Sequence, residues 1–492
     1  MSHLEIGWSR RDISTDEPVP IIGQAHLRIS DHCEDPLTLT ALALREEGTV
    51  IFLSVDATEI TSTLYRMILE KVRKKNPAVP TDAIIVNATH THTAGGFVRG
   101  CGWFSYEERA ETDEENVDTV PDPLSYYPIE KYREFLAENA ADAICEAYEN
   151  MTDGAVAFGY GSEVLGYSRR VVYEDKGIAQ MYGETNDPAF SGFEGGVDNK
   201  VNLLYTFDRN GTLTGAIVNI PCPSQCSENE WFLSADFWHE TRELIRAEYG
   251  DIFILPQCAA AGDAAPAVLY YKEAHARRLR AMYPDAKYPA RMEIAARIFH
   301  AFSETLAWCR SDLRRSMPIA HKVETVFLSK RLVTEEEKAE YEKILEKTRE
   351  TPFIKEGLSQ KERWVENTYR VGKIAQCHMI LERYEEDRVS DKFPMEMHTV
   401  RMGEIAFATS CFELYTDYMH RIQARAPFTQ TFVLQLCGIP QKNGGIYYLA
   451  NRRAMEKGGY SAYLFSNIIS AEGGQELVEA TLASLSELHE RK

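Results

Sequence analysis

Cysteines are few and dispersed, and none of the ten in this 492-residue chain lies in a CxxC pair. A chain of this length can bury a large core without disulfides, so the scatter favours a reducing compartment. Long apolar runs are also missing, which argues against a bilayer-spanning helix. The first residues, "MSHLEIGWSRRDIS", lack the charged-then-apolar pattern of a signal peptide. These absences predict a cytoplasmic protein that is not inserted into a membrane.

Basic residues are outnumbered by acidic ones: the chain has 54 Lys and Arg and 75 Asp and Glu, which gives a formal net charge of −21. Phosphate surfaces would repel such a chain, so no nucleic-acid or anionic-membrane partner is expected. No repeat, low-complexity tract or Pro/Ser linker interrupts the sequence. We therefore expect a single domain over residues 1–492 that acts on a small molecule, with its oligomeric state left open.

Segments with strand and helix patterns alternate along the chain. "TVIFLSVD" (49–56) is typical of a buried strand, a helix is expected over 59–75, and a second strand over 83–86. This strand–helix–strand unit predicts an α/β fold. The other expected elements are hairpins at 201–222 and 398–410, helices at 128–149, 236–248, 290–309 and 466–490, a strand at 251–257, an insertion at 267–290, and a helical excursion at 330–390.

Two of the 13 histidines lie one residue apart in "VNATHTHTAGG" (86–96). Residues two apart on a strand point to the same face, so His90 and His92 are expected to project together from the end of a strand. Gly95 and Gly96 then end the strand. Ligand sites in open α/β sheets gather at the carboxyl ends of strands. The pair therefore indicates either a metal or catalytic site, or two polar residues that cap a strand.

Four other stretches follow in order: "GYSRRVV" (166–172), "AIVNIPCPSQC…LSADF" (216–237), "AAAGDAAP" (259–266) and "SCFELY…NGGIYYLANRRAMEKGGY" (410–460). Together with "NATHTHTAGG", this order resembles the neutral/alkaline (non-lysosomal) ceramidase family over nearly the whole chain. The resemblance implies that family's catalytic domain, an α/β fold of mixed sheets with flanking helices. The carboxy-terminal immunoglobulin-like domain of the sphingolipid-cleaving members is expected to be absent.

Members of this family are zinc-dependent amide hydrolases, so the resemblance implies one Zn²⁺ per chain. It implies that the metal ligands include His90, Glu413 in "CFELY" and Tyr448 in "NGGIYYLAN". It also implies that His92 faces the substrate as a catalytic residue. The family's substrate-binding arginine corresponds to Arg169 or Arg170, and we assign Arg169 a catalytic role and Arg170 a substrate-binding role. Gly95 and Gly96, beside the histidines, are expected to contact the substrate.

Two positions depart from the family's pattern. Pro223, which cannot bind a metal, aligns with the family's second histidine ligand. The adjacent Cys222 is our candidate replacement, because a thiolate binds zinc well, and Gln225 and Cys226 are weaker candidates. Ala265 in "GDAAP" stands where the sphingolipid-cleaving enzymes have their catalytic serine. We therefore expect a metal-activated water to act alone, with Asp263 as an auxiliary base.

Several of these residues also have structural interpretations. Glu413 is at the start of a predicted helix, "FELYTDYMHRI", where an acidic side chain complements the helix dipole. Tyr448 could be a core residue, and Asp236 a helix N-cap with His239 as a reserve ligand. Three functions remain open: a metal-dependent hydrolase of an amide bond in a small soluble substrate, a hydrolase of glycosidic or ester bonds, and a non-catalytic relative that binds a ligand.

Overall fold

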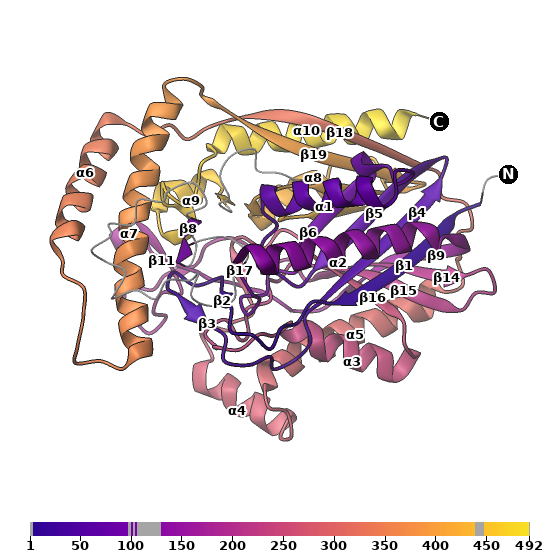
Figure 1. Cartoon of the computed structure of the whole chain (residues 1–492), viewed down its shortest axis with the longest axis horizontal. Coiled ribbons are helices and arrows are strands. Elements are labelled where there is room, and N and C mark those ends of the chain that lie inside the picture. The colour runs from indigo at the N-terminus through magenta and orange to yellow at the C-terminus, as the bar shows by residue number, and fades with distance from the viewer. Residues whose placement is uncertain (1–2, 97–99, 102–103, 106–128, 438–446, 492) are drawn as a thin grey trace.

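The centre of the computed structural model, which describes residues 3–96, 100–101, 104–105, 129–437 and 447–491, is an eight-stranded sheet (Figure 1). Its strands run in the order β16-β15-β14-β9-β1-β4-β5-β6. The pairs β15–β16 and β5–β6, at the two edges, are parallel, and the other pairs are antiparallel. The bounds are β1 Glu5–Asp12, β4 Thr38–Glu46, β5 Gly48–Val55, β6 Ile84–Ala88, β9 Thr152–Ser162, β14 Lys200–Asp208, β15 Leu213–Ile220 and β16 Phe253–Cys258.

A second, four-stranded sheet packs face to face on the first. Its order is β18-β19-β20-β22, with bounds Ile319–Ser329, Lys392–Met402, Ile405–Thr409 and Gln430–Leu434. The rings of Phe52 (β5) and Phe407 (β20) lie 4.9 Å apart between the two sheets. Leu42 and Leu44 face this interface, whereas the alternating Ala41 and Ala43 face the opposite core. Because both faces of the large sheet are buried, its strands are nearly continuous in apolar residues.

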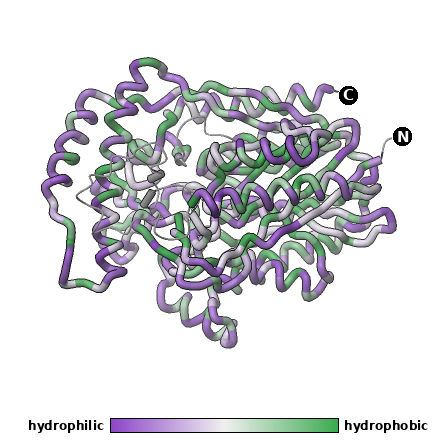
Figure 2. Tube along the Cα trace, viewed as in Figure 1, coloured by the Kyte–Doolittle hydropathy of each residue, from purple (hydrophilic) through white to green (hydrophobic). Residues whose placement is uncertain are grey.

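Helices cover the outer face of each sheet, which completes four layers (Figures 1 and 2). The large sheet is covered by α1 Ser62–Lys75, α2 Ile129–Glu149, α3 Phe237–Tyr249 and α5 Pro289–Cys309. The small sheet is covered by α8 Thr416–Gln423 and α10 Ala471–Glu490. Apolar segments gather among the strands, with the hydrophilic faces outside (Figure 2). The expected α/β class, with mixed sheets and flanking helices, is confirmed.

Within the described ranges, the same unit of a strand, a helix and a parallel strand occurs as β5-α1-β6, β15-α3-β16 and β20-α8-β22. In each unit the parallel strands end on the same edge of their sheet. The loops that follow these ends carry most of the motifs picked out in the sequence. Ligand sites of α/β proteins collect at such ends, so the topology itself brings these motifs together.

The charged segment at 330–390 forms α6 Glu335–Glu350 and α7 Gln360–Asp387, each started by a capping box, at Thr334 with Glu337 and at Ser359 with Glu362. Both helices lie at the end of the molecule opposite the two termini (Figure 1). No helix in the described ranges is long and apolar enough to cross a membrane.

The remaining elements are short: β2 Pro20–Ile21, β3 Arg28–Ile29, β7 Gly100–Cys101, β8 Phe104–Ser105, β10 Tyr167–Ser168, β11 Arg170–Tyr173, β12 Ile178–Met181, β13 Gly192–Phe193, β17 Ala264–Ala265, β21 Glu413–Leu414, β23 Tyr448–Leu449, α4 Lys272–Met282 and α9 Arg452–Lys457.

Candidate functional site

The histidine pair lies directly beyond the carboxyl end of β6, as the motif predicts. His90 has a left-handed backbone (φ 62°), which is uncommon outside glycine and turns the chain sharply. Its Nδ1 lies 2.7 Å from the carbonyl oxygen of Thr58, which can only accept a hydrogen bond, so Nδ1 carries the proton. In the neutral ring, Nε2 then has a free lone pair. This atom lies 3.4 Å from Nε2 of His92 and 3.3 Å from a carboxylate oxygen of Glu413.

Glu413 reaches the pair from the second sheet's side of the molecule. It lies in the two-residue strand β21, which pairs in parallel with β23 so that Glu413 is opposite Tyr448. The sequence placed Glu413 at a helix start, and this was wrong, because α8 begins at Thr416. The pairing strand comes 35 positions later, and its backbone hydrogen bond from Glu413 to Tyr447 (2.9 Å) is not a local signal. The structure thus brings two predicted metal ligands side by side.

Arg169 connects these groups. Its guanidinium is almost completely buried and donates hydrogen bonds to the carbonyl of Gly262 (2.9 Å) and the hydroxyl of Tyr448 (3.1 Å). It also lies 3.8 Å from the Glu413 carboxylate and 5.5 Å from the centre of the Tyr448 ring. Five of the predicted residues, on four separated segments, therefore converge on one point: His90, His92, Arg169, Glu413 and Tyr448.

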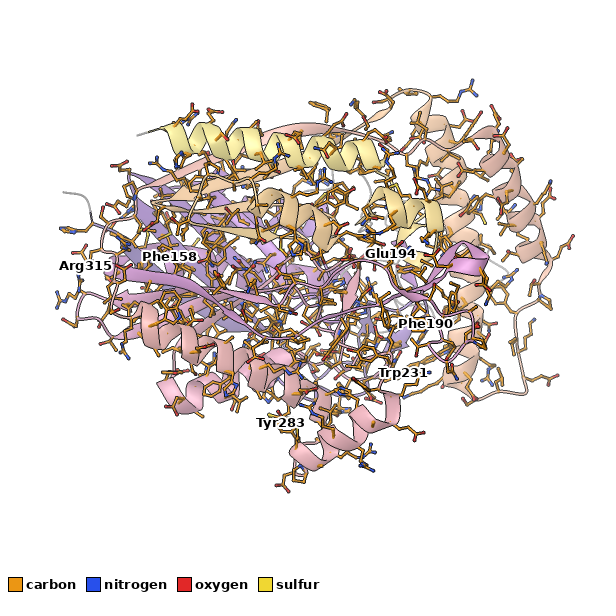
Figure 3. All side chains as sticks on the ribbon, turned by 180° about the vertical axis from the view of Figure 1, so that it is seen from behind. Phe158, Phe190, Glu194, Trp231, Tyr283 and Arg315 are labelled. Carbon is orange, nitrogen blue, oxygen red and sulfur yellow. The ribbon has the colours of Figure 1, made fainter. Side chains whose placement is uncertain are left out.

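Arg170, the neighbouring arginine, points elsewhere because successive residues of an extended chain face opposite ways. It is fully buried and pairs with Glu194 (2.5 Å), which is labelled in Figure 3. Its other nitrogens donate to the Ser461 hydroxyl (3.2 Å) and to the carbonyl of Gly458 (2.7 Å). All three guanidinium nitrogens are thus bonded to the chain itself, which favours a structural role over the predicted substrate contact.

The segment after β15 supplies Gln225 to the histidines. The Gln225 amide nitrogen lies 2.8 Å from Nε2 of His92. The Cys222 thiol instead hydrogen-bonds to the carbonyls of Leu165 (3.3 Å) and Pro223 (3.6 Å). Burial, together with the nearby Cys258, raises the pKa of the Cys222 thiol well above its usual value. Of the alternatives weighed in this segment, Gln225 is the side chain that contacts the pair.

His92 is tightly enclosed. A Cβ atom on Gly23 (φ +112°) would lie 2.5 Å from the His92 ring, so this glycine allows the backbone to pass over the imidazole. The Arg28 guanidinium donates to the His92 carbonyl (2.7 Å), and the Glu228 carboxylate lies 3.8 Å from its Nδ1. Burial, reinforced by His90 and by nearby arginines, lowers the pKa of His92 well below its usual value. Burial therefore favours the neutral form of this imidazole.

Three other predicted site residues contact the scaffold. An Asp263 carboxylate oxygen accepts hydrogen bonds from the backbone (3.0 Å) and hydroxyl (2.8 Å) of Thr416, the first residue of α8. Added Cβ atoms on Gly95 and Gly96 would lie 2.6 Å from Tyr132 and 2.8 Å from Ile22. Both glycines therefore permit close packing behind the histidines. Asp236 does cap α3, as one interpretation predicted.

Two tyrosines at the site did not emerge from sequence patterns. The ring of Tyr460 lies edge-on to that of Tyr448, with centroids 5.5 Å apart. Tyr182 follows β12 and lies beside Arg169, and burial raises its pKa to about 12. Tyr460 ends the quoted "GGY" stretch, so that motif could have identified it as a site residue. No motif surrounds Tyr182. Burial also raises the pKa of Tyr448 well above its usual value.

Comparison with solved structures identifies the architecture. Neutral ceramidase from Pseudomonas aeruginosa superimposes with a TM-score of 0.67 at 14% identity, over 99% of this chain and 75% of that one. The chain has the neutral-ceramidase fold. A ceramidase structure complexed with C2 matches similarly, with a TM-score of 0.66 at 13% identity over 100% of this chain and 76% of that one. No protein-family model matches the sequence, and no curated protein matches it.

A metal ion among the converging side chains of this neutral-ceramidase fold would require a definite spacing of donor atoms. Tetrahedral zinc with bonds of about 2.0–2.2 Å places neighbouring donor atoms roughly 3.3–3.6 Å apart. Of the predicted ligands, His90 Nε2 and a carboxylate oxygen of Glu413 lie 3.3 Å apart. Yet no group of three or more His, Cys, Asp and Glu side chains among the described residues is arranged to hold a metal ion. Tyr448, the third donor that the resemblance implies, lies opposite Glu413 in the paired strands β21 and β23.

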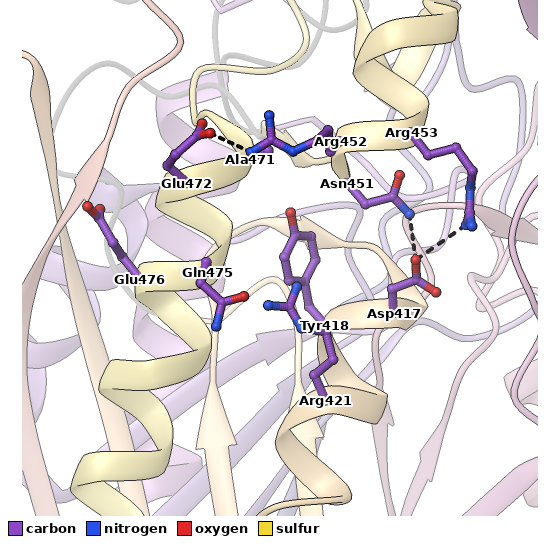
Figure 4. A pocket seen from close by; sticks show the side chains of 10 residues that line it. All are labelled: Asp417, Tyr418, Arg421, Asn451, Arg452, Arg453, Ala471, Glu472, Gln475 and Glu476. Carbon is purple, nitrogen blue, oxygen red and sulfur yellow. Dashed lines mark hydrogen bonds and ion pairs between the residues drawn. The ribbon is translucent and has the colours of Figure 1, made fainter.

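A separate cavity of about 510 Å³ opens between α8, α9 and α10 (Figure 4). Its charged side chains largely pair with one another: Arg452 with Glu472 (2.5 Å), and Arg453 with Asp417 (3.3 Å). None of the predicted site residues lines it. The cavity is therefore distinct from the convergence of side chains at His90.

Proposed function

We propose that this protein is a metal-dependent hydrolase that cleaves an amide bond in a small soluble substrate, with one zinc ion per chain. The observation that carries the proposal is the convergence of His90, His92, Arg169, Glu413 and Tyr448 at one point of a neutral-ceramidase fold. These side chains come from strand ends far apart in the sequence. A purely structural cluster would not require two imidazole nitrogens and a carboxylate to face one another.

His90, Glu413 and Tyr448 would hold the ion. The fixed proton on His90 Nδ1 favours this, because it leaves the Nε2 lone pair available. Cys222 is a poor fourth ligand, since its thiol hydrogen-bonds to the backbone carbonyls of Leu165 and Pro223. When bound, zinc lowers the pKa of a water and polarises a carbonyl group.

The remaining residues would handle the proton and the developing charge. His92 is neutral and accepts the proton from the attacking water, then delivers it to the leaving amine. Arg169 is held rigidly by Gly262 and Tyr448, so its charge is oriented before the substrate arrives. Ala265, buried in β17, offers no hydroxyl for a covalent intermediate. We therefore expect direct attack by water.

The test couples metal content to turnover. We expect the purified protein to contain about one zinc per chain by elemental analysis, and to hydrolyse members of a panel of N-acyl amides. His90→Ala should lose both the metal and the activity. His300→Ala, at an exposed histidine, is the matched control and should retain both.

Matched amide, ester and glycoside substrates decide among the bond types. A preference for esters or glycosides would replace the amide assignment while keeping the metal site. If the protein holds no metal and its melting temperature does not change on adding zinc, the hydrolase proposal fails, and the non-catalytic ligand-binding alternative takes its place.

A further inference from the structure

Tyr182 occupies a strained position beside the site. Its φ of 53° is left-handed, which is unfavourable for a bulky aromatic residue. The hairpin of β11 and β12 pairs Arg170 with Met181, and the Tyr182 amide then donates to the carbonyl of Arg169 (2.8 Å). This bond ties the strained residue directly to the arginine of the site. Strain of this kind persists where the surrounding structure enforces it, and it concentrates at functional sites.

The hydroxyl of Tyr182 is the second unusual feature. It is buried, and no hydrogen-bond acceptor for its proton is present in the described part of the chain. The Arg169 guanidinium lies beside it, but a guanidinium only donates. The carboxylates of Glu228 and Glu413 are near enough to interact electrostatically, yet neither accepts the proton. A buried phenol without an acceptor costs free energy, so a bound ligand that accepts its proton would relieve that cost.

Tyr173, on the same hairpin, shows the usual alternative. Its hydroxyl donates to the backbone carbonyl of Glu184 at 2.9 Å and so is satisfied by the fold. The hairpin can therefore provide an acceptor for a tyrosine hydroxyl. The missing acceptor for the Tyr182 hydroxyl is therefore a local property of the site and not of the whole hairpin.

We propose that Tyr182 donates a hydrogen bond to the carbonyl oxygen of the bound substrate, as a second donor next to Arg169. This inference rests on the proposed function and deepens it. The proton stays on the phenol throughout, and the bond strengthens as negative charge develops on the substrate oxygen. The same donor would bind a carboxylate oxygen of the acid product. The site is thus selective for acyl groups, whose oxygen accepts two hydrogen bonds.

Tyr182→Phe tests the inference against Tyr173→Phe as the matched control. We expect Tyr182→Phe to lower kcat/KM on a fluorogenic N-acyl coumarin amide about 10²-fold, the usual loss for one such donor. Its melting temperature should stay the same or rise, because no hydrogen bond is lost. Tyr173→Phe should do the opposite, with a lower melting temperature and near-normal kcat/KM. A Tyr182→Phe protein that melts lower and regains full activity on cooling would show a structural role and overturn the inference.

A binding measurement separates this inference from the proposed function. We expect the metal-loaded wild type to bind octanoate by calorimetry and Tyr182→Phe to bind it at least about tenfold more weakly. If the wild type turns over no amide but this difference remains, the hydrolase proposal fails and the Tyr182 inference stands. Equal octanoate affinity in the two proteins overturns the inference, as does a wild type that binds no octanoate.

Discussion

At the scale of single residues, the two imidazoles have different surroundings and hence different tasks. His90 is fixed by its hydrogen bond to Thr58, which sets the tautomer and directs Nε2 at Glu413. His92 is enclosed by Gly23 and contacted by Gln225, and burial keeps it neutral. A fixed lone pair suits a metal ligand, and a neutral buried ring suits a general base.

His92→Ala should therefore separate turnover from metal binding. We expect the variant to retain about one zinc per chain and to lose roughly 10²–10⁴-fold in kcat, the usual contribution of a general acid–base group. Elemental analysis and steady-state kinetics on the same preparation measure both quantities. Full activity in His92→Ala would limit this residue to a structural role, and loss of the metal would make it a ligand.

At the scale of elements, the site depends on how α8 is joined to the strand that carries Glu413. Two residues separate Glu413 from Thr416, where the helix begins. Asp263, from the loop after β16, holds this helix start through two hydrogen bonds. The neighbouring Gly262 packs so closely that an added Cβ would lie 2.5 Å from the Glu413 carbonyl. One loop therefore positions both the helix and the carboxylate.

Asp263→Ala should lower the free energy of unfolding by about 0.5–2 kcal/mol, the range for losing a side chain that accepts a hydrogen bond at a helix start. Asp263→Asn keeps a carbonyl oxygen for Thr416 and should lose less. Chemical denaturation of both variants measures the difference. If Asp263→Asn keeps its stability but loses activity, the carboxylate acts as the auxiliary base that the sequence predicts, and the capping role is secondary.

At the scale of the whole molecule, two sheets and two helical layers bury titratable groups far from the site. His321 on β18 lies with its Nε2 3.0 Å from Nδ1 of His398 on β19, and the Glu396 carboxylate lies 3.1 Å from the other nitrogen of His398. Burial, and then His398, lowers the pKa of His321 to about 3. The folded protein therefore holds this ring neutral under conditions where the unfolded chain would protonate it.

Stability should consequently fall with acidification. The pKa of His321 is about 3 when folded and near 6.5 when unfolded. The unfolded state therefore binds the extra proton between these values, and the stability present above pH 6.5 is lost progressively below it. This group contributes up to about 1.4 kcal/mol per pH unit. Melting temperatures between pH 7.5 and 5.5 should decline less in His321→Gln than in wild type or in the exposed control His300→Gln. Parallel curves for all three would assign the acid sensitivity to other groups.

The elements were largely predictable, because their signals are local. The helices expected over 59–75 and 236–248 are α1 and α3, and the hairpin at 201–222 is β14 with β15. The exception, Glu413, shows the limit of local signals. Its strand is only two residues long and exists because Tyr448 pairs with it. The helix-like pattern of residues 412–422 therefore did not indicate a strand at Glu413.

The sequence by itself determined the alternation of strands and helices through apolar periodicity. Its ordered motifs, through their resemblance to the ceramidase family, gave the candidates His90, His92, Arg169, Glu413 and Tyr448. Only the tertiary structure decided which side chains meet. Arg169 and Arg170 are adjacent, yet one contacts Tyr448 and the other Glu194. Cys222 and Gln225 are three residues apart, and only Gln225 contacts His92. The direction of a side chain depends on partners far away in the chain, because the backbone must first satisfy its own hydrogen bonds and packing.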